Sequence, residues 1–131
     1  MLGISSLIYY ISNNDINAGH DGLIIEVIPN HADSWIGIFA FGSMLSNSVN
    51  EVICGPGLNS LTVVSRGNGY IIDVTDPSKW ESVKAYPVLA SIPIPNSQMI
   101  LFHDYTELIA YDKNGFLWKT KQLSWDGIII D

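Results

Sequence analysis

Short apolar runs dominate this chain, and Gly, Asn, Asp or Pro separates each run from the next. β-Branched residues are frequent in the runs, a composition typical of strands joined by turns. Residues 23–28 ("LIIEVI") and 35–41 ("WIGIFAF") predict one hairpin with the polar link "PNHADS". Both predicted strands are apolar at nearly every position, which indicates that both of their faces are covered.

A second hairpin is predicted for residues 60–75, in which "SLTVVS" and "YIIDVT" flank "RGNG". Gly67 and Gly69 supply the backbone freedom that a tight turn needs. Apolar and polar residues alternate more in this hairpin than in the first one. We therefore expect one of its faces to meet water.

Residues 99–131 predict four further strands joined by three turns. The preceding segment 87–95 ("PVLASIPIP") contains three prolines, which lack a backbone donor, so we expect a sheet edge or a surface crossover there. One short helix is predicted over residues 76–85 ("DPSKWESVKA"). Asp76 would be its N-cap and Pro77 its first residue, which is a favoured pairing.

These elements predict a single all-β domain over residues 1–131. The expected architecture is antiparallel sheets arranged as a sandwich or open barrel built from consecutive hairpins. Propeller-like blade repeats are the alternative. Moving the sequence along itself by about 40 residues, a blade-like period, places Val63-Val64 on Leu101-Phe102 and also Trp80 on Trp118. A repeat of this length is typical of propeller blades, but the chain is too short to supply the four blades of a closed propeller.

Three strings in the second half of the chain carry a resemblance: "VVSRGNGYIIDVTDPSKW", "LFHDYTELIAYDKNGFLW" and "LSWDGIIID". They resemble a family of uncharacterised β-rich bacterial proteins, over roughly Val63 to Ile130. That family has no assigned activity, so the resemblance implies no catalytic residues. Its members run on past the Trp-Asp-Gly, so this chain is expected to be a short relative or to lack a final segment.

The composition narrows the classes of function. Charged residues make up 15% of the chain, below the roughly 25% of an average domain, and the net charge is −7. This balance argues against a nucleic acid or anionic membrane partner and favours a basic one. Cys54 is the only cysteine, so no internal disulfide forms, which is compatible with a reducing compartment. No signal peptide or membrane-spanning segment is read, so a cytoplasmic location is expected.

The string "YDKNG" raises the question of a calcium loop. With Gly115 at position 6 of such a loop, Asp112 and Asn114 would fill positions 3 and 5. Position 1 would then be Ala110 and position 12 Lys121, neither of which supplies a carboxylate. We therefore predict a hairpin turn with Asn114-Gly115 in type I′ geometry, and no metal site.

Histidine lies near an acid in three places: His20-Asp21, His31 with Asp33, and His103-Asp104. Adjacent residues of a strand point to opposite faces, so neither adjacent pair chelates a metal as it stands. Cys54 is a candidate nucleophile, but a Cys-His pair would require His103 to lie beside it in the fold. The string "EVIC" predicts instead that Cys54 lies at a buried strand end. These residues predict no catalytic site, no metal and no cofactor.

The four tryptophans are many for this length. We expect Trp35 and Trp118 to be buried and Trp125, beside a turn, to line a groove. The residues assigned to a possible contact surface are Trp125, Asp126, Trp118, His103 and Asp104.

Three functions are compatible with this pattern. The favoured one is a non-enzymatic interaction module with a protein partner or a second copy of itself, for instance an immunity-type binder of a basic partner. The others are a structural part of a larger β assembly, and a small-ligand binder or hydrolase that uses His31, Asp33, His103 and Asp104.

Overall fold

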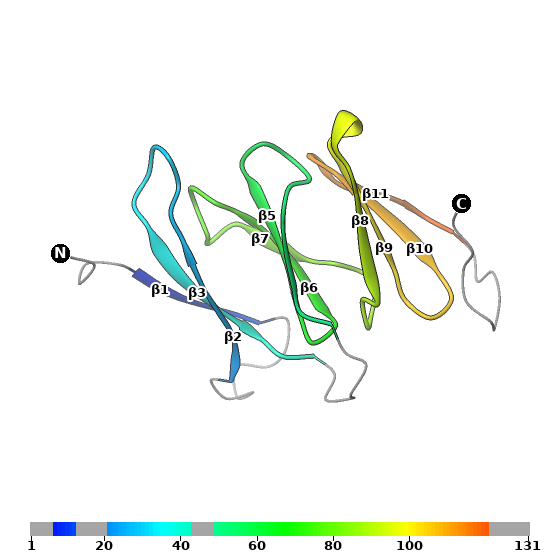
Figure 1. Ribbon diagram of the computed structural model, residues 1–131, viewed down its shortest axis with the longest axis horizontal. Coiled ribbons are helices and arrows are strands. Elements are labelled where there is room, and N and C mark those ends of the chain that lie inside the picture. The colour runs from blue at the N-terminus through cyan, green and yellow to red at the C-terminus, as the bar shows by residue number, and fades with distance from the viewer. Residues whose placement is uncertain (1–6, 13–20, 43–48, 121–131) are drawn as a thin grey trace.

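The computed structural model describes residues 7–12, 21–42 and 49–120. Within them the fold is all-β, with three sheets that lie side by side in chain order and do not close into a barrel (Figure 1). The N-terminal sheet has the order β1-β3-β2, with bounds Leu7–Ile11, Trp35–Ala40 and Gly22–Val27. β2 and β3 form the predicted first hairpin, and β1 pairs with β3 in parallel.

The other two sheets are antiparallel meanders of four strands each. The middle sheet contains β4 (Glu51–Cys54), β5 (Ser60–Ser65), β6 (Asn68–Asp73) and β7 (Trp80–Ser82). The C-terminal sheet contains β8 (Ala90–Ile94), β9 (Met99–His103), β10 (Leu108–Asp112) and β11 (Gly115–Lys119), with the short 3₁₀ turn η1 (Pro95–Ser97) before β9. The proline-containing strand β8 lies at a sheet edge, as the sequence predicts.

Two apolar clusters hold the three sheets together as a sandwich of three layers. One cluster joins the N-terminal and middle sheets and includes Trp35, Phe39, Val63, Tyr70 and Ile72. The other joins the middle and C-terminal sheets and includes Val64, Ile71, Phe102, Ile109 and Tyr111. Burial of apolar surface on this scale is the main stabilising term of such a fold.

The middle sheet is therefore covered on both faces. Thr62, Val63 and Val64 follow one another along β5 and are all fully buried. The expectation that one face of the β5–β6 hairpin meets water is wrong, because its outward-looking positions pack against the C-terminal sheet. Its turn has positive φ at Arg66 (46°) and Gly67 (88°), as a type I′ turn requires.

The two meanders repeat each other strand for strand. Val63 pairs with Tyr70 in the middle sheet, and Phe102 pairs with Ile109 at the equivalent place in the C-terminal sheet. The preceding strands follow the same register, since β4 and β8 pair with β5 and β9 at these positions. The structural repeat thus places Val63 on Phe102, whereas the alignment inferred from the sequence places it on Leu101.

A slip of this kind, by one position, moves every side chain to the other face of the sheet. The sequence therefore revealed the existence of a repeat but not its register. Blade-like repetition describes these two sheets, although the described strands form no closed propeller.

The helix expected over residues 76–85 is absent. Asp73 Oδ1 accepts hydrogen bonds from the Thr75 and Asp76 backbone N–H groups, and Asp76 Oδ1 accepts one from the Ser78 hydroxyl. These local bonds form a turn in place of a helix N-cap. Trp80 and Ser82 then pair with Ile72 and Tyr70 of β6. Strand pairing at this edge of the middle sheet therefore overrides the local helix signal.

Candidate functional site

The loops at one end of the sandwich form the candidate site. This loop end carries residues 28–34, 55–59, 74–79 and 95–98 together with the β10–β11 turn, and several of these loops are visible at the top of Figure 1. Three clefts open there between neighbouring loops. The loop between β4 and β5 contributes to all three, so it is the central structure of the loop end.

The β4–β5 loop is braced by hydrogen bonds at both of its ends. The backbone N–H of Gly55 donates to the carbonyl of Ser60 at 2.8 Å, and the N–H of Gly57 donates to the Ser60 hydroxyl at 2.7 Å. The buried Thr62 hydroxyl donates to the Gly55 carbonyl at 2.9 Å. Gly55 has φ +120°, a conformation that favours glycine. The sequence "GPG" therefore produces a well-defined loop conformation.

Leu58 lies at the tip of this loop and is 91% exposed, the most exposed large apolar side chain of the described residues. It lines each of the three clefts. Ile28, in the neighbouring β2–β3 loop, is 73% exposed and shares one cleft with it. Leu58 and Ile28 therefore place two exposed apolar side chains beside one cleft, and exposed apolar groups that lie together mark contact surfaces.

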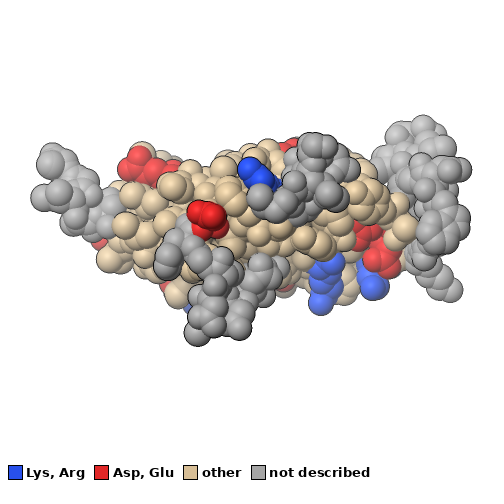
Figure 2. Space-filling model, turned by 90° about the horizontal axis from the view of Figure 1, so that it is seen from below, with Lys and Arg blue, Asp and Glu red and all other residues tan. Residues whose placement is uncertain are grey.

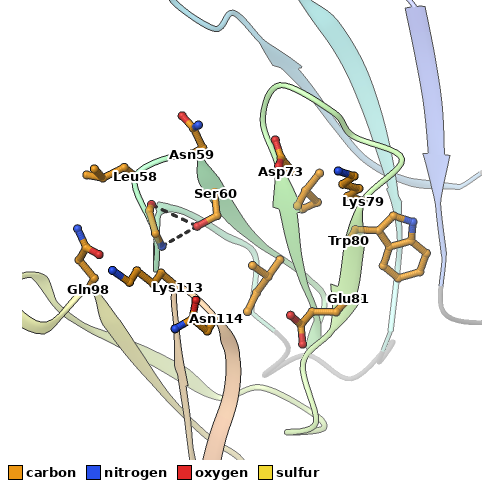
Figure 3. Close-up of a pocket in the computed structure, with 13 residues that line it drawn as sticks. Leu58, Asn59, Ser60, Asp73, Lys79, Trp80, Glu81, Gln98, Lys113 and Asn114 are labelled. Atoms are coloured by element: carbon orange, nitrogen blue, oxygen red, sulfur yellow. Dashed lines mark hydrogen bonds between the residues drawn. The ribbon is translucent and has the colours of Figure 1, made fainter.

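The largest cleft lies between the middle and C-terminal sheets and has a volume of about 690 Å³. Figure 3 shows Glu81 reaching into it from β7, with Gln98, Lys113 and Asn114 on the opposite wall. The Trp80 ring points away from the cleft and packs edge-on against Tyr70, 5.7 Å between ring centroids. The lining of the cleft is thus mixed, with charged and amide side chains beside apolar ones such as Leu58 and Ile71.

Two carboxyl groups of this cleft have pKa values shifted in opposite directions. Burial raises the pKa of Glu81, and the nearby Lys84 ammonium offsets only part of that rise. No hydrogen bond or ion pair holds the Glu81 carboxylate within the described residues. Burial also acts to raise the pKa of Asp73, but hydrogen bonds from Thr75 and Asp76 outweigh it and hold the pKa below its usual value. Asp73 is thus committed to its own turn, whereas Glu81 is available to a ligand.

Tyr111 ties the C-terminal sheet to the middle sheet just below this cleft. Its hydroxyl accepts a hydrogen bond from the Lys84 N–H at 2.9 Å and donates one to the Ser82 carbonyl at 3.3 Å. Burial raises the pKa of Tyr111, although the bond from Lys84 opposes the rise. The Tyr111 hydroxyl is therefore a structural link between sheets and not a reactive group.

The structure does not bring the paired His and Asp residues together. His31 and Asp33 belong to the loop end, whereas His103 ends β9 and Asp104 follows it at the opposite end of the sandwich. A strand of about five residues spans roughly 17 Å, so these groups have no common site for acid–base chemistry. Cys54 is also at the loop end, away from His103, and is exposed, contrary to the expectation of a buried strand end. His20 lies outside the described residues.

The predicted contact-surface residues are likewise dispersed. His103 and Asp104 shape the β9–β10 turn, in which Asp104 Oδ1 accepts hydrogen bonds from the N–H groups of Thr106 and Glu107. Trp118 lies on β11 and is 41% exposed, so the expectation that it is buried is wrong, whereas Trp35 is buried as expected. Trp125 and Asp126 lie outside the described residues. Sequence reasoning missed Leu58, since a single leucine in a Gly-Pro-Gly loop carries no motif.

The "YDKNG" string forms a hairpin turn, as predicted. The Asn114 N–H donates to Asp112 Oδ1 at 2.8 Å, so this carboxylate bonds within the turn. The turn residues are Lys113 and Asn114, and only Gly115 has positive φ (+113°), so the expected type I′ geometry at Asn114-Gly115 is wrong. Among the described residues no group of three or more His, Cys, Asp or Glu side chains is arranged to hold a metal ion.

Comparison with protein-family models, with curated proteins and with solved structures finds no match for this chain. The resemblance to a bacterial family therefore stays a prediction. In the described part of the chain no helix has the length and apolar character needed to cross a membrane.

Proposed function

We propose that this protein is a non-enzymatic interaction module that binds a protein partner across its loop end. An apolar side chain of the partner would pack on Leu58, and a basic group of the partner would approach Glu81 in the adjacent cleft. The observation that carries this proposal is the exposure of Leu58, 91%, at the tip of a loop that hydrogen bonds fix in place.

The character of the clefts supports a protein partner over a small molecule. All three clefts open to solvent around one protruding loop, whereas small-molecule sites bury most of their ligand in a concave pocket. A partner surface can contact several shallow clefts at once. A fixed loop also loses little conformational entropy on binding, which favours affinity.

The charge of the chain supports a basic group on the partner. The net charge is −7, and the view from below in Figure 2 shows isolated acidic and basic groups on a largely uncharged surface. Attraction to a basic partner would come from this overall charge, while Glu81 supplies a local contact. An immunity-type role toward a basic protein is one concrete form of this proposal. A cytoplasmic location is a further part of it, and the single cysteine is compatible with a reducing compartment.

A selection from a library of displayed random peptides tests the proposal. The wild-type protein is the bait, and the Leu58→Asp variant is used for counter-selection. We expect enrichment of peptides that contain a basic residue and a large apolar residue. If no peptide is enriched, or if the enriched peptides bind Leu58→Asp equally well, the loop end is not the binding surface.

The affinity of an enriched peptide, measured by calorimetry, sharpens the test. We expect Leu58→Asp to weaken binding by about tenfold or more, as for a central contact residue, and Glu81→Gln to weaken it by less. Ile24→Lys is the matched control, because Ile24 is 68% exposed but lies on the N-terminal sheet. Its affinity should equal that of the wild type. The stability of Leu58→Asp should change by less than about 0.5 kcal/mol, because the side chain is in water.

A further inference from the structure

The outward face of the N-terminal sheet is apolar and exposed, so the expectation that both faces of the β2–β3 hairpin are covered is wrong. Ile8 is paired with Ile36, and Ile38 with Ile24, which places these four residues on the side away from the middle sheet. Ile8 is 66% exposed and Ile24 is 68% exposed. Glu26 is the only charged residue in β1, β2 and β3. A sheet face of this composition is typical of a surface that another protein layer covers.

The outward face of the C-terminal sheet is also apolar. One cross-strand row runs over all four of its strands, from Ile92 to Leu101 to Ala110 to Trp118. Ile109 and Tyr111, which flank Ala110 in the chain, belong to the cluster that faces the middle sheet, so this row faces away from it. Trp118, at the end of the row, is 41% exposed, Ile92 and Leu101 are half-buried, and the small Ala110 between larger neighbours is buried.

The repeat between the two meanders identifies what this row corresponds to. Ile53, Thr62 and Ile71 form the row of the middle sheet that is equivalent to Ile92, Leu101 and Ala110. In the middle sheet that row is covered, since Ile53 and Ile71 belong to the cluster shared with the C-terminal sheet. The outward face of the C-terminal sheet is therefore the repeat of a face on which another sheet docks.

The repeat also gives the stack a direction. The middle and C-terminal sheets are related by a shift along the stack, so the two end faces of the molecule are different surfaces. Figure 1 shows them at opposite sides, one on the N-terminal sheet and the other on the C-terminal sheet. A stack of this kind continues in the same sense only when the last sheet of one copy meets the first sheet of the next.

We propose that a second copy of this chain docks head to tail, with the outward face of its N-terminal sheet against the outward face of the C-terminal sheet. The two faces are three and four strands wide, and the strands of the N-terminal sheet contribute a single charge. The contact is heterologous, because different faces of the two copies meet. Each face is a single sheet of three or four short strands, so we expect a reversible association.

Sedimentation equilibrium over a range of protein concentrations tests the proposal on the full chain. We expect the average molar mass of the wild type to rise with concentration. Ile24→Lys and Trp118→Lys should each remain monomeric at concentrations at which the wild type associates. Circular dichroism checks that both variants fold, and Ile8→Lys or Ile92→Lys replaces either one that does not.

An equimolar mixture of the two variants separates head-to-tail docking from other arrangements. Ile24→Lys keeps an intact C-terminal face and Trp118→Lys keeps an intact N-terminal face, so the mixture should form dimers that grow no further. A wild type that stays monomeric at every concentration, or a mixture that contains only monomers, overturns the proposal. Leu58→Asp is the matched control and should associate like the wild type, so this result is independent of peptide binding at the loop end.

Discussion

The middle and C-terminal sheets are two copies of one design in different surroundings. Both are four-stranded meanders whose equivalent residues pair in the same register. Yet five of the six residues of β5 are buried, whereas β9, its equivalent, buries only Ile100 and Phe102, which face the middle sheet. Burial in this fold therefore depends on the position of a sheet in the stack. A strand pattern alone does not reveal whether a neighbour covers it.

The most direct test of this comparison places asparagine at two equivalent positions, one in each sheet. Val64 of β5 corresponds to His103 of β9 in the repeat, and Val64 is fully buried in the cluster between the middle and C-terminal sheets. Val64→Asn should lower the free energy of unfolding by about 3 kcal/mol or more, because it buries an amide without partners. His103→Asn should cost less than about 1 kcal/mol. Urea unfolding of both variants measures the two losses of unfolding free energy. Equal losses would contradict the claim that the two positions differ in burial.

Removal of the tyrosine hydroxyls that join neighbouring sheets should have a smaller effect on the free energy of unfolding. Tyr70, fully buried, donates to the Ala40 carbonyl at 2.9 Å across the N-terminal and middle sheets. Tyr111 is fully buried too, but its hydroxyl links the middle and C-terminal sheets through Ser82 and Lys84, which are more exposed. Tyr70→Phe should destabilise the fold by about 2 kcal/mol and Tyr111→Phe by about 1 kcal/mol, because water can replace part of the second link. A larger loss for Tyr111→Phe in thermal unfolding would contradict this order.

Replacement of the two carboxyl groups of the largest cleft should have the smallest effects on stability, and these effects have opposite signs. The pKa of Asp73 is lowered in the folded state, so its stabilising contribution is present above its ordinary pKa and is lost as the pH falls through the folded value. The pKa of Glu81 is raised, so its ionisation reduces stability as the pH rises through its ordinary and folded values.

Melting temperatures measured at about pH 7 and about pH 3 check both signs. Asp73→Asn should lower the melting temperature at the higher pH, through loss of this contribution. Glu81→Gln should raise it slightly there. Both variants should move toward the wild type at the lower pH, as the carboxyl groups take up protons. A Glu81→Gln variant less stable than the wild type at neutral pH would show that the carboxylate has a stabilising partner.

The hairpins were predictable from the sequence, but the relation between them was not. Apolar runs bounded by Gly, Pro and Asn are sufficient to define β2–β3, β5–β6 and β9–β10. The register of the repeat was missed because Val63-Val64 and Leu101-Phe102 are each apolar at both positions, so a slip by one position looks equally good in the sequence. Only strand pairing distinguishes the two alignments. The prediction of a helix at residues 76–85 is wrong for a related reason, because strand pairing of Trp80 overrides the local helix preference.

The candidate site was the least predictable part. Leu58 is prominent because the β4–β5 loop protrudes among three clefts, a property of the assembled loops and not of any motif. The His and Asp pairs were visible in the sequence, but the strand order places them at opposite ends of the sandwich. Exposure of Trp118 follows from its register opposite Ala110, which a sequence pattern does not define.

Chemical cross-linking between introduced cysteines tests most directly the claim that the two end faces of the stack are complementary. Ile24→Cys and Trp118→Cys are made separately in a Cys54→Ser background, because Cys54 is exposed. The linker is a flexible bismaleimide that spans about 10 Å, the usual distance between stacked sheets. The account predicts a cross-linked dimer when the two variants are mixed and little when either is treated alone. Dimers formed by Ile24→Cys alone, or none in the mixture, would contradict it.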